Sequence, residues 1–174
     1  MLTSQLEIIK QGQNYLNVLI NKNSNEDYGK VFSPLFISSA GAHMRHIIDH
    51  YLALIAGLQS GKVDYDVRHR NAKVEQDPTL ALEKLTQISC WLKSLSGSDL
   101  TRVLTLSTEI SVHEQKVQSV PTSLARELVF TGSHAVHHYA MIAQIAQQQK
   151  MVLPSSFGIA PATATYLRKT IKSA

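Results

Sequence analysis

Apolar residues recur at helical spacing in several long stretches of the chain. In the first stretch, Leu6, Ile9 and Leu16 follow the i, i+3, i+4 spacing of one helix face. This pattern predicts a helix over Leu2–Ile20. A polar run follows, in which asparagine and serine break the pattern, and we expect a loop over residues 21–38.

A second amphipathic stretch predicts a helix over Ser39–Gln59. Ser38 and Ser39 are candidate N-caps, and Gly61 follows the last apolar turn, where glycine commonly ends a helix. The next segment, residues 62–70, is dense in charge and is interpreted as an ordered loop whose charges neutralise one another. An alternative is that its charged residues and a nearby glutamate bind an anionic substrate; these residues are Asp64, Asp66, Arg68, Arg70 and Glu75.

The pair Asp77-Pro78 predicts the start of a third helix, because aspartate caps the first turn and proline suits the first helical position. Apolar spacing carries this helix to about Ser96. Beyond it, Val103–Ile110 alternates with a period near two, and a second short run covers Lys116–Val120. The two runs favour a small hairpin between the third and fourth helices.

The longest amphipathic stretch predicts a fourth helix over Pro121–Gln149. We expect a loop over Leu153–Pro161 and a short closing helix over Thr163–Lys172. Four long helices separated by loops indicate an all-α fold, a four-helix bundle with a possible small hairpin, in one domain over residues 1–174.

Composition limits the classes of function. Of the 174 residues, 44% are hydrophobic and 17% are charged, with a net charge of +4, and the basic residues are scattered rather than gathered in a stripe. Nucleic-acid binding is therefore disfavoured. No apolar run is long enough to span a membrane, and the first residues do not resemble a signal peptide. With a single cysteine, Cys90, we expect a cytoplasmic protein without an internal disulfide.

Histidines carry most of the functional information. The chain has eight. Six fall in two short windows on the second and fourth predicted helices, namely His43, His46 and His50, and then His134, His137 and His138.

The second window has the spacing of a helical metal site. Residues four apart on a helix differ by about 40° in direction, so His134 and His138 project side by side. His137 points about 100° away from His138, and we predict that it is not a ligand. A pair of imidazoles rarely holds a divalent ion tightly, so a third ligand is needed.

The first window contains three candidates for that third ligand: His43, His46 and His50. Ligands from facing helices of a bundle converge in its core. Three neutral imidazoles would leave coordination positions open, as in catalytic rather than structural metal sites. The alternative interpretation is a polar seam in which the imidazoles only form hydrogen bonds.

Both windows resemble the signature stretches of the DinB-like family of metal-binding helical bundles. The matching residues are Ala42–His50 and Ser133–Tyr139, the latter containing the H-x-x-H-H motif. The resemblance implies that His46, His134 and His138 are the metal ligands, and it assigns no role to the other two histidines of the first window. Many members continue with Arg-Gly-Gln after the last histidine, whereas this chain has Tyr139-Ala140-Met141.

The same resemblance implies a range of functions. Some relatives are thiol-dependent transferases or isomerases that use bacillithiol or mycothiol, and others resemble metal-dependent hydrolases. We therefore expect a divalent ion (Zn, Ni or Fe), a small-molecule substrate or low-molecular-weight thiol, and either a monomer or a homodimer. A non-catalytic metal-binding or sensing module is the alternative, which a fourth ligand such as His50 would favour. The catalytic residues stay unassigned.

Four further residues have alternative interpretations. Glu127 lies two turns before His134 and is either a general base or hydrogen-bond acceptor near the site, or a carboxylate that interacts with the helix dipole or pairs with Arg45. Asp49 either orients an imidazole or faces solvent. Cys90 is expected to be a buried core thiol rather than a nucleophile, and Trp91 is expected in the core.

Overall fold

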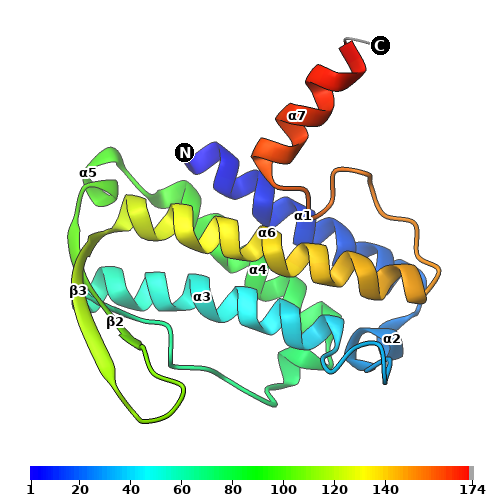
Figure 1. Ribbon diagram of the computed structural model, residues 1–174, viewed down its shortest axis with the longest axis horizontal. Coiled ribbons are helices and arrows are strands. Elements are labelled where there is room, and N and C mark those ends of the chain that lie inside the picture. Colours follow the sequence, from blue (N-terminus) through cyan, green and yellow to red (C-terminus); the bar gives the residue numbers. More distant parts are fainter. Residues whose placement is uncertain (173–174) are drawn as a thin grey trace.

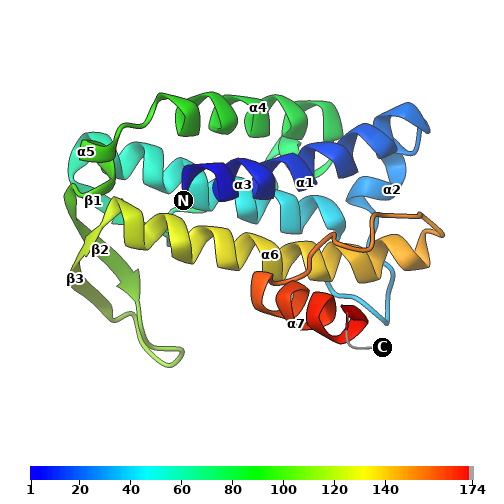
Figure 2. The same ribbon diagram turned by 90° about the horizontal axis from the view of Figure 1, so that it is seen from above.

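Four long helices lie side by side in the computed structural model, which describes residues 1–172 (Figures 1 and 2). They are α1 (Leu2–Asn21), α3 (Ala40–Ser60), α4 (Pro78–Ser94) and α6 (Leu124–Gln148). The most extensive helix contacts pair α1 with α4 and α3 with α6. The two helices that carry the histidine windows are therefore direct neighbours.

Local capping explains where the helices begin and end. The Ser39 hydroxyl accepts the Ala42 amide at 3.1 Å at the start of α3, and Gly61 ends that helix with φ 82°, in the left-handed region. At α4, Asp77 caps the first turn as the sequence predicts. The second predicted helix is thereby confirmed to within a residue at each end.

A three-stranded sheet closes one end of the molecule, at the left of Figure 1. β1 (Lys62–Asp64) pairs in parallel with β2 (Val103–Glu109), which pairs antiparallel with β3 (Val117–Ser123). The predicted hairpin is confirmed as β2 and β3. The purely all-α class is not confirmed, because β1 forms inside the segment expected to be a loop. With three residues, this strand is too short to show a period of two.

The prediction that Pro121 opens the last long helix is wrong. Pro121 lies in β3 opposite Thr105, and the helix begins at Leu124, after Ser123, whose hydroxyl accepts the Arg126 amide at 3.3 Å. Proline has no amide hydrogen and is tolerated on an edge strand, which explains how it fits there.

Shorter helices complete the structure. α2 (Asn25–Gly29) lies in the expected loop 21–38, and α5 (Gly97–Leu100) follows α4, which ends two residues before the predicted Ser96. A 3₁₀ turn, η1 (Lys73–Glu75), precedes α4. α7 (Pro161–Lys172) is the predicted closing helix, and it projects from the body of the molecule in Figure 1.

The core between the long helices is apolar, and its largest side chains are tyrosines: Tyr15, Tyr28, Tyr51 and Tyr139. Trp91 is half-buried and packs against this core. None of the helices within residues 1–172 combines the length and apolar character that crossing a membrane requires.

Candidate metal centre

Three histidines from α3 and α6 come together, and we call His46, His134 and His138 the histidine triad. The Nε2 atom of His134 lies 3.0 Å from Nε2 of His46 and 3.1 Å from Nε2 of His138. One ligand atom of each residue lies within 4.8 Å of those of the other two. All three side chains are half-buried. The structure thus brings together the same three residues that the resemblance implies.

The helix pairing explains this convergence. His134 and His138 occupy successive turns of α6, and α3 packs directly against that helix. The side chain of His46 therefore meets the pair from the facing helix. His137 is exposed and does not join the group, in keeping with its direction on the helix.

The geometry of the triad fits a divalent transition metal. Zinc binds imidazole nitrogens at about 2.0–2.1 Å, which places two tetrahedral nitrogen ligands ~3.3 Å apart. The observed separations of 3.0 and 3.1 Å are close to that value. Among residues 1–172, no fourth histidine, cysteine, aspartate or glutamate belongs to this group. An ion held here would keep coordination positions for other ligands.

Electrostatics favour the neutral form of the triad. Burial, and then the neighbouring imidazoles, lower the pKa of His46 to about 2 and that of His138 to about 3. Burial and the adjacent His50 lower the pKa of His134 to about 4, and the charge of Arg68 adds to the effect. The triad imidazoles are therefore neutral at neutral pH, and neutral imidazole is the form that binds metal.

The other two histidines of α3 have distinct positions. The Nδ1 atom of His43 lies 2.9 Å from Nδ1 of His138, on the side of the ring opposite the triad. His50 is buried, and its Nδ1 donates to the carbonyl of His46 at 3.0 Å. His43 is therefore placed to orient a triad imidazole, whereas His50 lies beside the triad without joining it.

Two aromatic side chains that sequence reasoning missed border the triad. The ring of Phe130 stacks on that of His134 at 5.7 Å with an interplanar angle of 12°. The ring of Tyr65 stacks on that of His50 at 4.8 Å and 18°. Phe130 precedes His134 by one helical turn, a spacing that could have revealed it. Tyr65 lies in a charged segment and gave no comparable signal.

Asp49 does not contact the triad. Its buried carboxylate accepts hydrogen bonds from the ring Nδ1 of His69 at 2.8 Å, the backbone amide of His69 at 3.2 Å and the Arg45 guanidinium at 3.1 Å. Arg45 also pairs with Glu75 at 2.9 Å. Asp49 therefore orients the imidazole of His69, whereas the expectation was that it orients a metal-binding imidazole. The expectation of a solvent-facing side chain is wrong.

Glu127 is fully buried near the start of α6. Its carboxylate accepts hydrogen bonds from Tyr65 at 2.7 Å, Thr122 at 2.6 Å and Arg126 at 2.8 Å. The expected pairing with Arg45 is wrong, because Arg126 takes that place. Glu127 does lie in the first turn of α6, where the other alternative, an interaction with the helix dipole, places it. The carboxylate therefore holds Tyr65 in position beside His50, and it does not contact the triad histidines.

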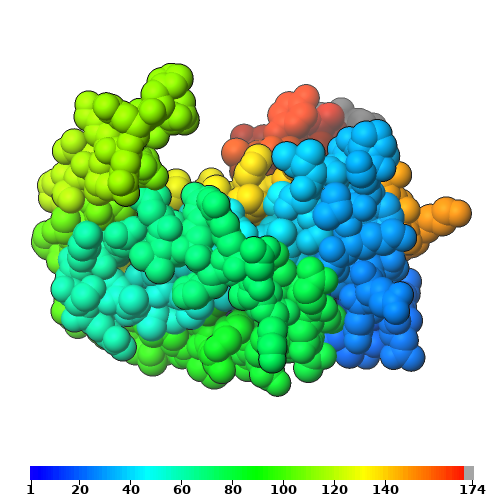
Figure 3. Space-filling model, turned by 90° about the horizontal axis from the view of Figure 1, so that it is seen from below, coloured from blue at the N-terminus to red at the C-terminus, as the bar shows by residue number. Residues whose placement is uncertain are grey.

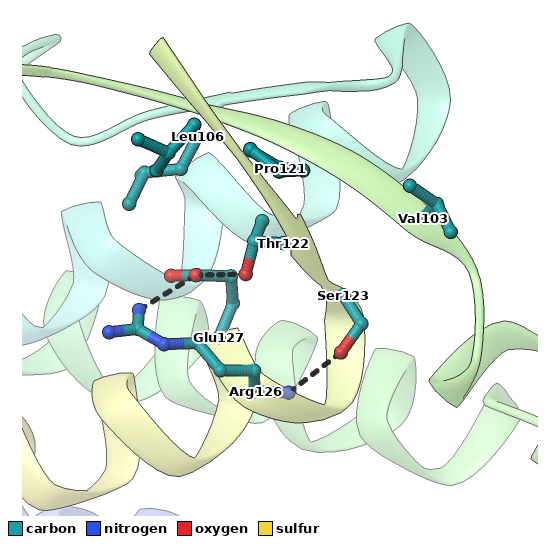
Figure 4. A pocket seen from close by; sticks show the side chains of 8 residues that line it. Val103, Leu106, Pro121, Thr122, Ser123, Arg126 and Glu127 are labelled. Atoms are coloured by element: carbon teal, nitrogen blue, oxygen red, sulfur yellow. Dashed lines mark hydrogen bonds and ion pairs between the residues drawn. The ribbon is translucent and has the colours of Figure 1, made fainter. Parts of the chain in front are cut away.

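Glu127 also lies at a pocket of about 610 Å³ between the hairpin and α6, shown in Figure 4. None of the triad histidines lines this pocket, so it is distinct from the candidate metal centre. Its lining residues are Val103, Leu106, Val120, Pro121, Thr122, Ser123, Arg126 and Glu127.

Cys90 is exposed on α4, so the expectation of a buried core thiol is wrong. The helix that carries it contributes none of the triad histidines.

The molecular surface is hollowed between the β2–β3 hairpin and the opposite end of the molecule, and part of α6, in yellow, forms the floor of this hollow (Figure 3).

Comparison with known proteins supports the fold. No protein-family profile matches the chain. The FK506-binding protein 5 of Rhizopus delemar is 34% identical over 107 residues, which are 62% of this chain and 28% of that protein. The chain thus spans less than a third of that relative's length. The crystal structure of a DinB-like protein from Bacillus subtilis superposes with a TM-score of 0.59 at 15% identity, over 86% of this chain and 95% of that one. The chain therefore has a DinB-like fold, with three histidines within metal-binding distance of one another.

Proposed function

We propose that this protein belongs to the DinB-like family and binds one divalent transition-metal ion through His46, His134 and His138. The observation that carries the proposal is the convergence of three imidazole Nε2 atoms, with separations of 3.0 and 3.1 Å around that of His134. An all-imidazole donor set suits Zn²⁺, Ni²⁺ or Fe²⁺ rather than Mg²⁺ or Ca²⁺, which prefer oxygen ligands.

The proposed activity is that of a metal-dependent hydrolase or thiol-dependent transferase acting on a small molecule. A bound ion of this kind activates a water or thiol at neutral pH by lowering its pKa. The triad would hold that ion, His43 would orient His138, and Phe130 would limit the access of water to the ring of His134. Because the ligands are neutral, they would leave the positive charge of the ion available to a substrate.

The position of His50 favours this proposal over a non-catalytic module. As a fourth ligand, His50 would close the coordination shell. Instead, His50 does not belong to the group of histidines whose ligand atoms converge, and its ring packs between Tyr65 and His134. We also propose that the protein acts in the cytoplasm, because its exposed, unpaired Cys90 suits a reducing compartment.

A comparison of metal-loaded and metal-free protein tests the proposed activity. Both forms are assayed for ester and amide hydrolysis and for the transfer of low-molecular-weight thiols, alongside the His138→Ala and His137→Ala variants. We expect turnover that requires the added ion, disappears in His138→Ala and persists in His137→Ala. Stoichiometric metal binding without any turnover across the panel would instead favour the non-catalytic module.

A further inference from the structure

The segment after β1 is tied to both helices that carry the triad. At its start, the Tyr65 hydroxyl donates to Glu127 at 2.7 Å and lies 3.2 Å from the Thr131 hydroxyl, both on α6. At its end, His69 is held to Asp49 on α3 by its ring and its backbone amide, at 2.8 and 3.2 Å. The segment therefore bridges α6 and α3 beside the triad.

Arg68 lies between these two anchors and is free to meet a ligand. Its side chain is exposed, and it forms no ion pair or hydrogen bond with any residue of the described range 1–172. The other arginines near the site are engaged, because Arg45 pairs with Asp49 and Glu75, and Arg126 pairs with Glu127. The carboxylates of Asp49, Glu75 and Glu127 are thus paired with these other arginines and not with Arg68.

The neighbours of Arg68 place it beside the triad. Tyr65, three residues earlier, stacks on His50, whose ring lies against those of His46 and His134. His69, the next residue, is bonded to Asp49 on α3. Arg68 is therefore a cation without a partner near an all-imidazole site that contributes no negative charge of its own.

We propose that Arg68 is a specificity-determining residue that binds the carboxylate of an anionic substrate whose reactive end reaches the triad. This inference rests on the proposed function, because it assumes an ion at the triad. The planar guanidinium fork matches a carboxylate through two parallel hydrogen bonds. A substrate with a carboxylate at one end and a metal-binding thiol or carbonyl at the other would contact both groups.

The neighbouring Arg70 provides a matched control. It is exposed in the same segment and carries the same charge, but it lies beyond the His69 anchor. Replacing Arg70 therefore changes the net charge as replacing Arg68 does, without removing the proposed contact.

The test uses two thiols that differ in their charge. Co²⁺-loaded wild type, Arg68→Ala, Arg68→Lys and Arg70→Ala are titrated with mercaptoacetate and with 2-mercaptoethanol, and thiolate binding is followed by the thiolate-to-Co²⁺ absorption band. Co²⁺ content is measured first, because an absence of stoichiometric Co²⁺ in the wild type would refute the proposed function and this inference with it.

We expect Arg68→Ala to weaken mercaptoacetate binding about tenfold, the size of one lost charge-assisted interaction, and to leave 2-mercaptoethanol binding unchanged. The affinity of Arg68→Lys for mercaptoacetate should lie between those of Arg68→Ala and the wild type. The affinity of Arg70→Ala should equal that of the wild type. With Co²⁺ bound, the inference is overturned if Arg68→Ala and Arg70→Ala bind mercaptoacetate equally, if both thiols weaken alike, or if the wild type does not bind mercaptoacetate.

Discussion

The Nδ1 atoms of His43 and His138 lie 2.9 Å apart, which joins one imidazole of the triad to a second histidine on α3. If Nε2 of His138 binds a metal, its Nδ1 carries the proton and donates to Nδ1 of His43. This arrangement fixes the tautomer and the direction of the His138 ring, as hydrogen-bond partners of metal-binding histidines commonly do.

The His43→Ala substitution should therefore weaken metal binding without abolishing it. Loss of such an orienting partner typically costs 10- to 100-fold in affinity, and we expect a reduction of about that size. Competition with a chromophoric chelator measures it. His113→Ala, in an exposed part of the β2–β3 hairpin, is the matched control and should bind as the wild type does. Equal affinities of the two variants would show that His43 does not act on the site.

The buried hydrogen bonds of Glu127 predict a loss of stability. Tyr65→Phe removes one of three donors to a fully buried carboxylate, so we expect the free energy of unfolding to fall by about 1–3 kcal/mol. Urea denaturation of the metal-free protein measures the change. Tyr166→Phe, at a residue with 67% exposure on α7, should have little effect. A Tyr65→Phe protein as stable as the wild type would contradict this account of the buried network.

The pH dependence of stability follows from the lowered histidine pKa values. In the unfolded chain the three triad imidazoles take up protons near pH 6.5, whereas in the folded protein they do so at about 2 to 4. Between these limits the unfolded state binds more protons, so the free energy of unfolding falls as the pH falls.

Above pH 6.5 these groups add no further slope. Urea denaturation of the metal-free protein from pH 8 to pH 5 should show constant stability that then declines below about pH 6.5. The decline should be shallower in a His46→Gln variant, which has one fewer buried imidazole. A stability that rises on acidification over this range would contradict the assignment of neutral, buried imidazoles.

Much of the helical architecture could be predicted because its signals are local. Asp77-Pro78 marks the start of α4, and Ser39 and Gly61 mark the two ends of α3. β1 could not be predicted, because its three residues are defined by pairing with β2, some forty positions later. The predicted start of α6 was three residues too early for the same reason, because Pro121 pairs with Thr105 in the sheet and the helix begins at Leu124.

The sequence likewise predicts the part of the candidate site that depends on local spacing, but not the part that depends on distant contacts. The spacing of His134 and His138 predicts two neighbouring imidazoles, and the structure places His46 beside them. Whether they bind an ion stays a prediction. The surroundings depend on contacts between distant segments, such as that of Tyr65 with Glu127. The pattern of apolar residues on α4 made Cys90 resemble a core residue, but one helical face is exposed there.

The exposed position of Cys90 leads to a prediction about chemistry. A thiol reagent should modify Cys90 in the native protein, because the side chain is accessible on α4. Neither this modification nor Cys90→Ser should change the metal content or any metal-dependent turnover, since α4 contributes no residue to the triad. Loss of turnover in Cys90→Ser, with the metal retained, would assign the chemistry to the thiol instead.

Elemental analysis of the purified, metal-replete protein tests the central claim most directly. The wild type and His137→Ala should each carry one equivalent of a transition-metal ion per chain, whereas His46→Ala, His134→Ala and His138→Ala should carry almost none, with unchanged far-ultraviolet circular dichroism. A wild type without stoichiometric metal, or triad variants that keep one equivalent at similar affinity, would contradict the claim that these three histidines form a metal centre.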